Sequence, residues 1–149
     1  MRPRLFLLIS LLREAGDNFL AEGRTSDARQ VFLKALHLLL EVSTQSDAGE
    51  HPAFVPRVEA LVQSLASEAL PVPTQAMLMQ HYENTGQWAK AEDTLFSILE
   101  ATVNDRASME FGIAFYERIL RQNDAALLAG NLPRGEAEEG LRELTRRIS

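Results

Sequence analysis

Apolar side chains recur at intervals of three and four residues along most of the chain, the spacing that places them on one face of an α-helix. Near the N-terminus Leu5, Ile9, Leu12 and Phe19 follow this spacing and predict a helix over about 3–22. The same pattern predicts six more helices: from Ser26 or Asp27 to about 42, 56–70, 74–84, one that ends near 103, one that begins at 105 or 108, and one from Pro133 to about 148. No segment alternates apolar and polar residues between turn residues, as a β-strand does. We therefore expect an all-α fold of about seven helices.

Glycine and proline residues mark where several of these helices end. Gly23 follows the first helix, and the segment Pro71-Val72-Pro73 follows the third, where proline removes a backbone donor. From Ser43 to Pro56 the chain is rich in small and polar residues, which is typical of a linker. Because 149 residues are enough for one core, we expect a single domain over 1–149, with an internal boundary at 43–56 as the alternative.

Two parts of the chain share one spacing of small and bulky apolar residues around a glycine turn. The first set is Leu12, Ala15, Gly16, Phe19, Gly23, Ala28, Phe32 and Ala35. The second set is Leu78, Met79, Tyr82, Gly86, Trp88, Ala91, Leu95 and Ile98. A small residue on one helix lets its neighbour approach closely, so each set predicts an antiparallel helical hairpin. The remaining helices are expected to act as irregular caps.

The segment from Tyr82 to Glu92, which reads YENTGQWAKAE, resembles the turn and second helix of the tetratricopeptide-repeat superfamily. The runs AEDTLF, FYERIL and GNLPR are also similar to a group of uncharacterised bacterial proteins with such hairpins. The chain departs from a regular array, because Ala28 and Ala91 lie 63 residues apart, whereas the repeat period is about 34. Met79 stands where a small residue is usual, so we expect a wider helix separation in the second hairpin.

The resemblance also implies where a partner would bind. In tetratricopeptide proteins the first helix of each repeat lines a concave groove that holds a protein segment. The matching positions in this chain are Arg13, Asp17, Leu20, Gln80, Glu83 and Asn84. Their mixture of charges disfavours the recognition of a C-terminal carboxylate, because Asp17 and Glu83 oppose Arg13.

Composition and charge narrow the classes of partner. The formal net charge is −6, and such a surface repels phosphate backbones, so no nucleic-acid partner is expected. The chain has no cysteine and therefore no disulfide framework. Arg2 and Arg4 precede an apolar run, but charged residues follow from Arg13, well before the length of a membrane span. We expect a cytoplasmic protein without a leader or a membrane segment.

The sequence contains no pattern that predicts catalysis. His37, His51 and His81 share no metal-ligand spacing, and the glycine-rich phosphate loops and nucleophile elbows are missing. Adjacent carboxylates such as Glu92 and Asp93 diverge on a helix and are expected to be solvated. Trp88 is expected to pack inside its hairpin. No metal, cofactor or catalytic residue is therefore expected.

Two hypotheses about function follow. The first is a non-catalytic adaptor or scaffold that binds a protein or peptide through its hairpin groove. The alternative is a homo-oligomer or complex subunit that associates through apolar faces of its first two helices, including Phe6, Leu7, Leu33 and Leu40. An enzyme with a dispersed active site is a third and less favoured interpretation.

Overall fold

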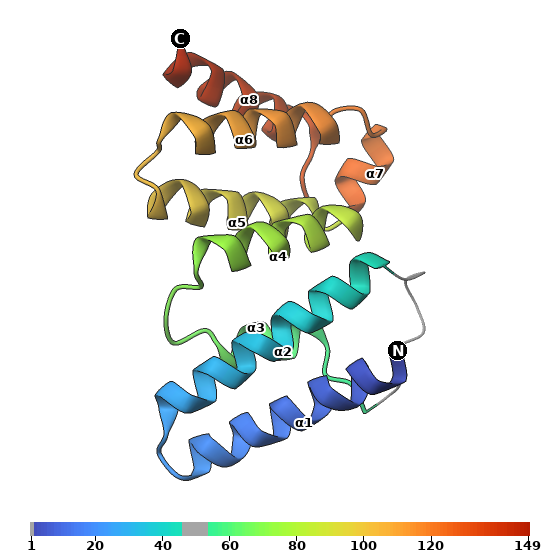
Figure 1. Ribbon diagram of the computed structural model, residues 1–149. Coiled ribbons are helices and arrows are strands. Elements are labelled where there is room, and N and C mark those ends of the chain that lie inside the picture. The colour runs from blue at the N-terminus through green and yellow to red at the C-terminus, as the bar shows by residue number, and fades with distance from the viewer. Residues whose placement is uncertain (1, 46–53) are drawn as a thin grey trace. The chain divides into compact units, whose positions relative to one another are not determined.

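The computed structural model describes residues 2–45 and 54–149, with side chains from Arg4 to Ser43 and from Phe54 onward. Over these residues the chain forms eight α-helices joined by turns, without a β-strand (Figure 1). The all-α prediction is confirmed, and the count exceeds the expected seven by one. The chain divides into two compact units, Met1–Pro71 (unit 1) and Val72–Ser149 (unit 2). Most of the predicted linker, residues 46–53 with His51, lies outside the described residues.

The described residues of unit 1 form three helices: α1 (Arg2–Ala21), α2 (Thr25–Gln45) and α3 (Val58–Ser64). The turn between α1 and α2 passes through Gly23, whose φ of +76° is a conformation that glycine adopts without strain. Gly16 of α1 lies against the ring of Phe32 of α2, where a Cβ atom would overlap the ring. The predicted close approach of the two helices is therefore confirmed at this position.

The third helix is shorter than the predicted 56–70 and ends at Ser64. The segment that follows returns to α2, where the Arg29 guanidinium donates to the carbonyl of Ala69 at 2.7 Å and pairs with Glu68 at 3.4 Å. A helix continued through this segment would lack the N–H donor of Pro71. Buried Leu61 and Leu65 fix the short helix to the unit's core.

Unit 2 contains five helices: α4 (Val72–Asn84), α5 (Trp88–Ala101), α6 (Arg106–Ile119), α7 (Asp124–Ala129) and α8 (Arg134–Ile148). α4 packs beside α5, and α6 beside α8 (Figure 1). α4 begins at Val72, earlier than predicted, because Pro73 is well accommodated in a first turn whose N–H groups have no intrahelical partner. Asp105, one of the two predicted starts of this helix, caps α6 by accepting from the N–H of Ser108 at 2.8 Å.

The turn after α4 and the short helix α7 form the surroundings of Trp88. Its indole N–H donates to the carbonyl of Ala126 at 2.9 Å, and Gly130 packs against its ring. The tryptophan is 7% exposed, so the prediction that it packs in the core is confirmed. α7 itself was not predicted; the side chain of Asn123 caps it by accepting from the N–H of Ala126.

The oligomer hypothesis placed four apolar residues of α1 and α2 on the surface. The structure exposes only one of them. Phe6 and Leu40 are buried, and Leu33 is half-buried. Leu33 and Leu40 contribute to packing because the apolar pattern of α2 is wider than one face, and Phe6 packs from the buried face of α1. Of the four, Leu7 alone is exposed.

Candidate partner-binding cleft

Three helices of unit 2 enclose a cleft of about 640 Å³. α5, α6 and α8 each contribute side chains, although the residues are far apart in the sequence. The lining residues are Glu92, Phe96, Leu99, Glu100, Asn104, Tyr116, Glu136, Glu139, Gly140, Glu143, Leu144 and Arg147. We call this site the acidic cleft.

Two glycines allow α6 and α8 to pack closely beside the acidic cleft. A Cβ atom at Gly112 of α6 would lie 2.7 Å from Cδ1 of Leu144 of α8. A Cβ atom at Gly140 of α8 would overlap the ring of Tyr116 of α6. Because neither glycine has a side chain, the two helices meet here and Tyr116 is fully buried between them.

The hydroxyl of Tyr116 donates to the Glu92 carboxylate at 2.5 Å, which joins α6 to α5. Burial raises the pKa of Glu92, the hydrogen bond opposes this shift, and the charges of Glu136 and Asp93 add to it. Burial and the same hydrogen bond raise the pKa of Tyr116. The prediction that Glu92 is a solvated charge is therefore wrong. Its partner is 24 residues away in the sequence, and no local pattern indicates that contact.

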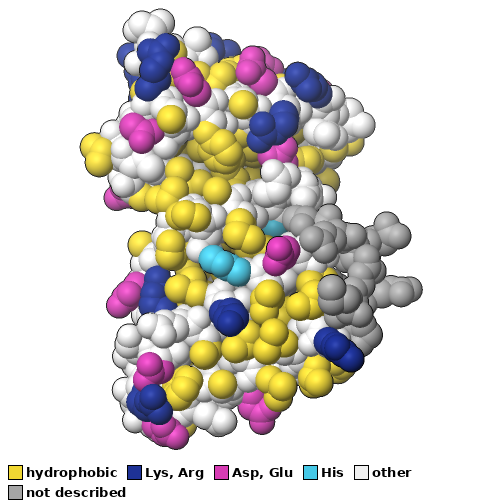
Figure 2. All heavy atoms as spheres, in the orientation of Figure 1, with side chains coloured by type: hydrophobic (Ala, Val, Ile, Leu, Met, Phe, Trp, Pro, Cys, Tyr) yellow, Lys and Arg dark blue, Asp and Glu magenta, His cyan; other side chains and the backbone are white. Residues whose placement is uncertain are grey.

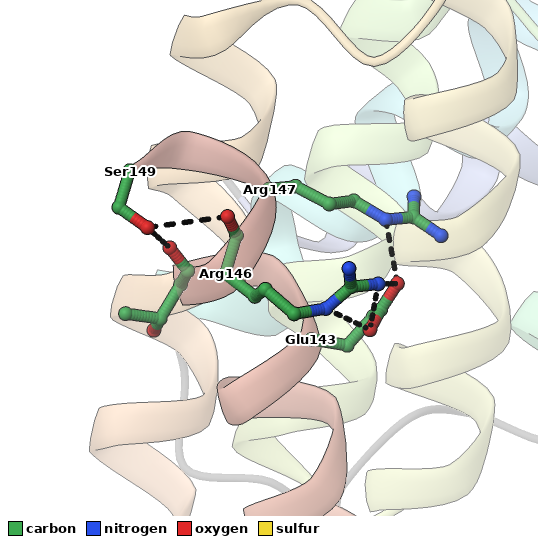
Figure 3. A network of polar contacts seen from close by, with 5 residues as sticks. Glu143, Arg146, Arg147 and Ser149 are labelled. Atoms are coloured by element: carbon green, nitrogen blue, oxygen red, sulfur yellow. Dashed lines mark hydrogen bonds and ion pairs between the residues drawn. The ribbon is translucent and has the colours of Figure 1, made fainter.

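Carboxylates dominate the edge of the acidic cleft, with five glutamates against the single guanidinium of Arg147. Figure 3 shows the side chains of Arg146 and Arg147 directed at the Glu143 carboxylate. Both donate to it at 2.8 Å, and these hydrogen bonds lower the pKa of Glu143. Glu143 and Arg147 are four residues apart on α8, a spacing at which side chains of one helix meet.

Arg142 of the same helix donates to the Glu139 carboxylate at 2.7 Å. Glu100 and Glu136 make no ion pair with any described residue. The acidic cleft therefore keeps negative charge that the chain does not neutralise locally.

One wall of the acidic cleft is apolar. Leu99 and Leu144 are buried in it, while the ring of Phe96 remains 50% exposed. An exposed aromatic ring beside carboxylates offers contact area to an apolar side chain and electrostatic attraction to a cation. The arrangement is suited to binding, because clefts of about 300–1,000 Å³ with an apolar lining and a few polar groups are typical of ligand sites.

The six residues of the predicted groove lie outside the acidic cleft and belong to both units. In unit 1, Arg13, Asp17 and Leu20 are exposed on α1. In unit 2, the predicted groove residues lie on α4, and each has a side-chain hydrogen bond. The amide of Gln80 donates to Asn84 at 2.9 Å, and Glu83 accepts two hydrogen bonds from Arg118 at 2.8 and 2.9 Å. A groove formed by all six residues stays a prediction.

Metal clusters and membrane-spanning helices are absent from the residues that the structure describes. No group of three or more His, Asp or Glu side chains in this part of the chain is arranged to hold a metal ion. None of the helices from α1 to α8 combines the length and the apolar character that a membrane span requires.

Comparison with known proteins gives one match. The model of a family of unknown function, DUF6483, matches residues 6–149, which include every helix from α2 to α8 and most of α1. No curated protein and no solved structure matches the chain.

Proposed function

We propose that this chain, which belongs to the family of unknown function DUF6483, is a non-catalytic interaction protein that binds a segment of another protein in the acidic cleft. The observation that carries the proposal is the combination of the half-exposed Phe96 ring with five carboxylates in one cleft of about 640 Å³. The segment that fits this chemistry carries Lys or Arg next to an apolar side chain.

Charge complementarity supports this type of segment. Glu100 and Glu136 have no ion-pair partner among the described residues, so a bound cation satisfies them without displacing an existing contact. Glu143 and Glu139, in contrast, already bond arginines of α8. A cationic segment is attracted by the surrounding field and oriented by the two unpaired carboxylates.

The hydrogen bond between Tyr116 and Glu92 in the acidic cleft also supports a binding role. A tyrosine hydroxyl is already protonated at neutral pH, burial raises the pKa of Tyr116 further, and this hydroxyl donates to Glu92. A protonated phenol is a weak nucleophile and a weak base. The pair therefore acts as a structural link between α5 and α6.

Selection of displayed peptides on the purified chain tests the proposal. The cleft variant carries Glu100→Lys and Glu136→Lys, and the matched control carries the same change at the exposed residues Glu59 and Glu117, outside the acidic cleft. We expect the wild type and the control to enrich peptides with Lys or Arg beside apolar residues. The affinity of these peptides for the cleft variant should fall at least tenfold.

A second variant, Phe96→Ala, tests the apolar wall and should weaken the same peptides without changing their preference for basic residues. Enrichment of sequences without basic residues, or equal binding to the cleft variant, would refute the proposal. Circular dichroism of each variant verifies that the helices are retained.

A further inference from the structure

The outer face of α1 carries an apolar stripe that no described residue covers. Leu7, Leu8 and Leu11 are 54%, 40% and 52% exposed, whereas Phe6 and Ile9 on the opposite face are buried. Positions 7, 8 and 11 share one helix face at 3.6 residues per turn. Figure 2 shows hydrophobic side chains gathered over α1 and α2. Contiguous exposed apolar residues of this kind mark interaction surfaces.

Opposite charges stand at the two ends of this stripe. Arg4 precedes Leu7 by three residues and Glu14 follows Leu11 by three, so both lie on the same helix face. Both side chains are exposed, and neither forms an ion pair within the part of the chain that the structure describes. The order along the face is therefore cation, leucines, anion, with its centre at residue 9.

This order of charges and leucines on one helix matches the same order on a second copy of the helix that runs in the opposite direction. If two copies of α1 pack antiparallel around a two-fold axis near residue 9, Leu7 meets Leu11 of the partner subunit and Arg4 meets Glu14 of the partner subunit. A parallel pairing would place the two Arg4 side chains together, where they repel each other. A two-fold contact uses the same surface on both subunits, as this stripe requires.

We propose that the chain forms a homodimer in which the outer face of α1 docks antiparallel on the same face of a second copy. The contact uses one helix face, which is smaller than the roughly 800 Å² per partner that stable interfaces bury. We therefore expect a weak and reversible dimer. A lipid surface fits the stripe less well, because Glu14 closes it with a negative charge.

Sedimentation velocity of the full chain over a range of concentrations tests the dimer. The wild type should shift from monomer to dimer in the micromolar range, and Leu7→Glu with Leu11→Glu should remain monomeric. Leu128→Glu is the matched control, because it introduces a charge at an equally exposed leucine of α7 in unit 2 and should dimerise like the wild type. A wild type that stays monomeric, or a dimer that survives the Leu7 and Leu11 changes, overturns the proposal.

Charge reversal tests the orientation of the helices. Arg4→Glu alone and Glu14→Arg alone should each weaken the dimer several-fold, and the double variant should restore it. The native chain has no cysteine, so a mixture of the single variants Arg4→Cys and Glu14→Cys should cross-link mainly to each other upon oxidation. Cross-linking of Arg4→Cys mainly to itself indicates a parallel contact and contradicts the model of pairing. Binding to anionic vesicles by a monomeric wild type would instead assign the stripe to a lipid surface.

Discussion

Two glycines of α8 are expected to respond in opposite ways to the same substitution. Gly140 lies against the fully buried ring of Tyr116, so the added Cβ of Gly140→Ala overlaps that ring. Gly135, in the first turn of the same helix, has no atom within 4 Å of the position that a Cβ would take. The pair therefore separates the effect of packing from the effect of helix propensity.

The magnitudes follow from these surroundings. Replacing glycine by alanine inside a helix stabilises it by about 0.5–1 kcal/mol, which is the whole expected effect at Gly135. Overpacking a core costs about 1–3 kcal/mol. The cost at Gly140 lies in the upper half of that range, because the hydroxyl of Tyr116 is held by Glu92 and the ring cannot turn away. When the gain in helix propensity is subtracted from this cost, Gly140→Ala should destabilise unit 2 by about 1–2.5 kcal/mol.

Urea unfolding monitored by circular dichroism measures both changes. A third variant, Tyr116→Leu, removes the ring and should reduce the cost of Gly140→Ala by more than half, since interacting residues are not additive. If Gly140→Ala is as stable as Gly135→Ala, or if its cost is unchanged by Tyr116→Leu, then α6 and α8 do not pack as described and the reasoning fails.

Three further predictions concern single contacts in unit 2. The pKa of Glu92 is raised by burial, so the folded chain binds a proton at a pH where the unfolded chain has lost it. The free energy of unfolding of the wild type, relative to that of Glu92→Gln, should therefore fall as the pH rises from the pKa of Glu92 in the unfolded chain through its pKa in the folded chain. Urea titrations at several pH values measure this difference, and a difference that does not change with pH contradicts the prediction. Asn123→Ala removes the cap of α7 and should cost about 1 kcal/mol, against no measurable loss for the neighbouring exposed Gln122→Ala. Trp88→Phe removes the hydrogen bond to Ala126 and should cost at least about 1 kcal/mol in thermal or urea unfolding; an unchanged midpoint contradicts the bond.

Much of the helical framework could be predicted, because it depends on local patterns. The three- and four-residue spacing indicated the long helices, and the close contact of Gly16 with Phe32 was expected from the hairpin pattern. α7 was missed because six residues are too short to show a periodicity. The start of α4 was misplaced because Pro73 was interpreted as a helix stop, although proline also suits a first turn.

The candidate sites were less predictable, because they depend on contacts between distant segments. The acidic cleft requires α5, α6 and α8 to converge, and its link from Tyr116 to Glu92 spans 24 residues. One available sign was Gly140, since a glycine inside a strongly predicted helix often indicates close packing. For α1 the sequence showed an excess of apolar residues, but only the structure separates exposed Leu7 from buried Phe6.

Because the chain has a single tryptophan, two spectroscopic signals can follow the unfolding of different parts of the protein. Trp88 lies wholly within unit 2, with its indole N–H bonded to α7, so intrinsic fluorescence follows the unfolding of that unit alone. Far-ultraviolet circular dichroism instead follows the helices of both units. One denaturation experiment with both detectors thus distinguishes a chain that melts as one cooperative body, with coincident curves, from one whose halves melt in turn.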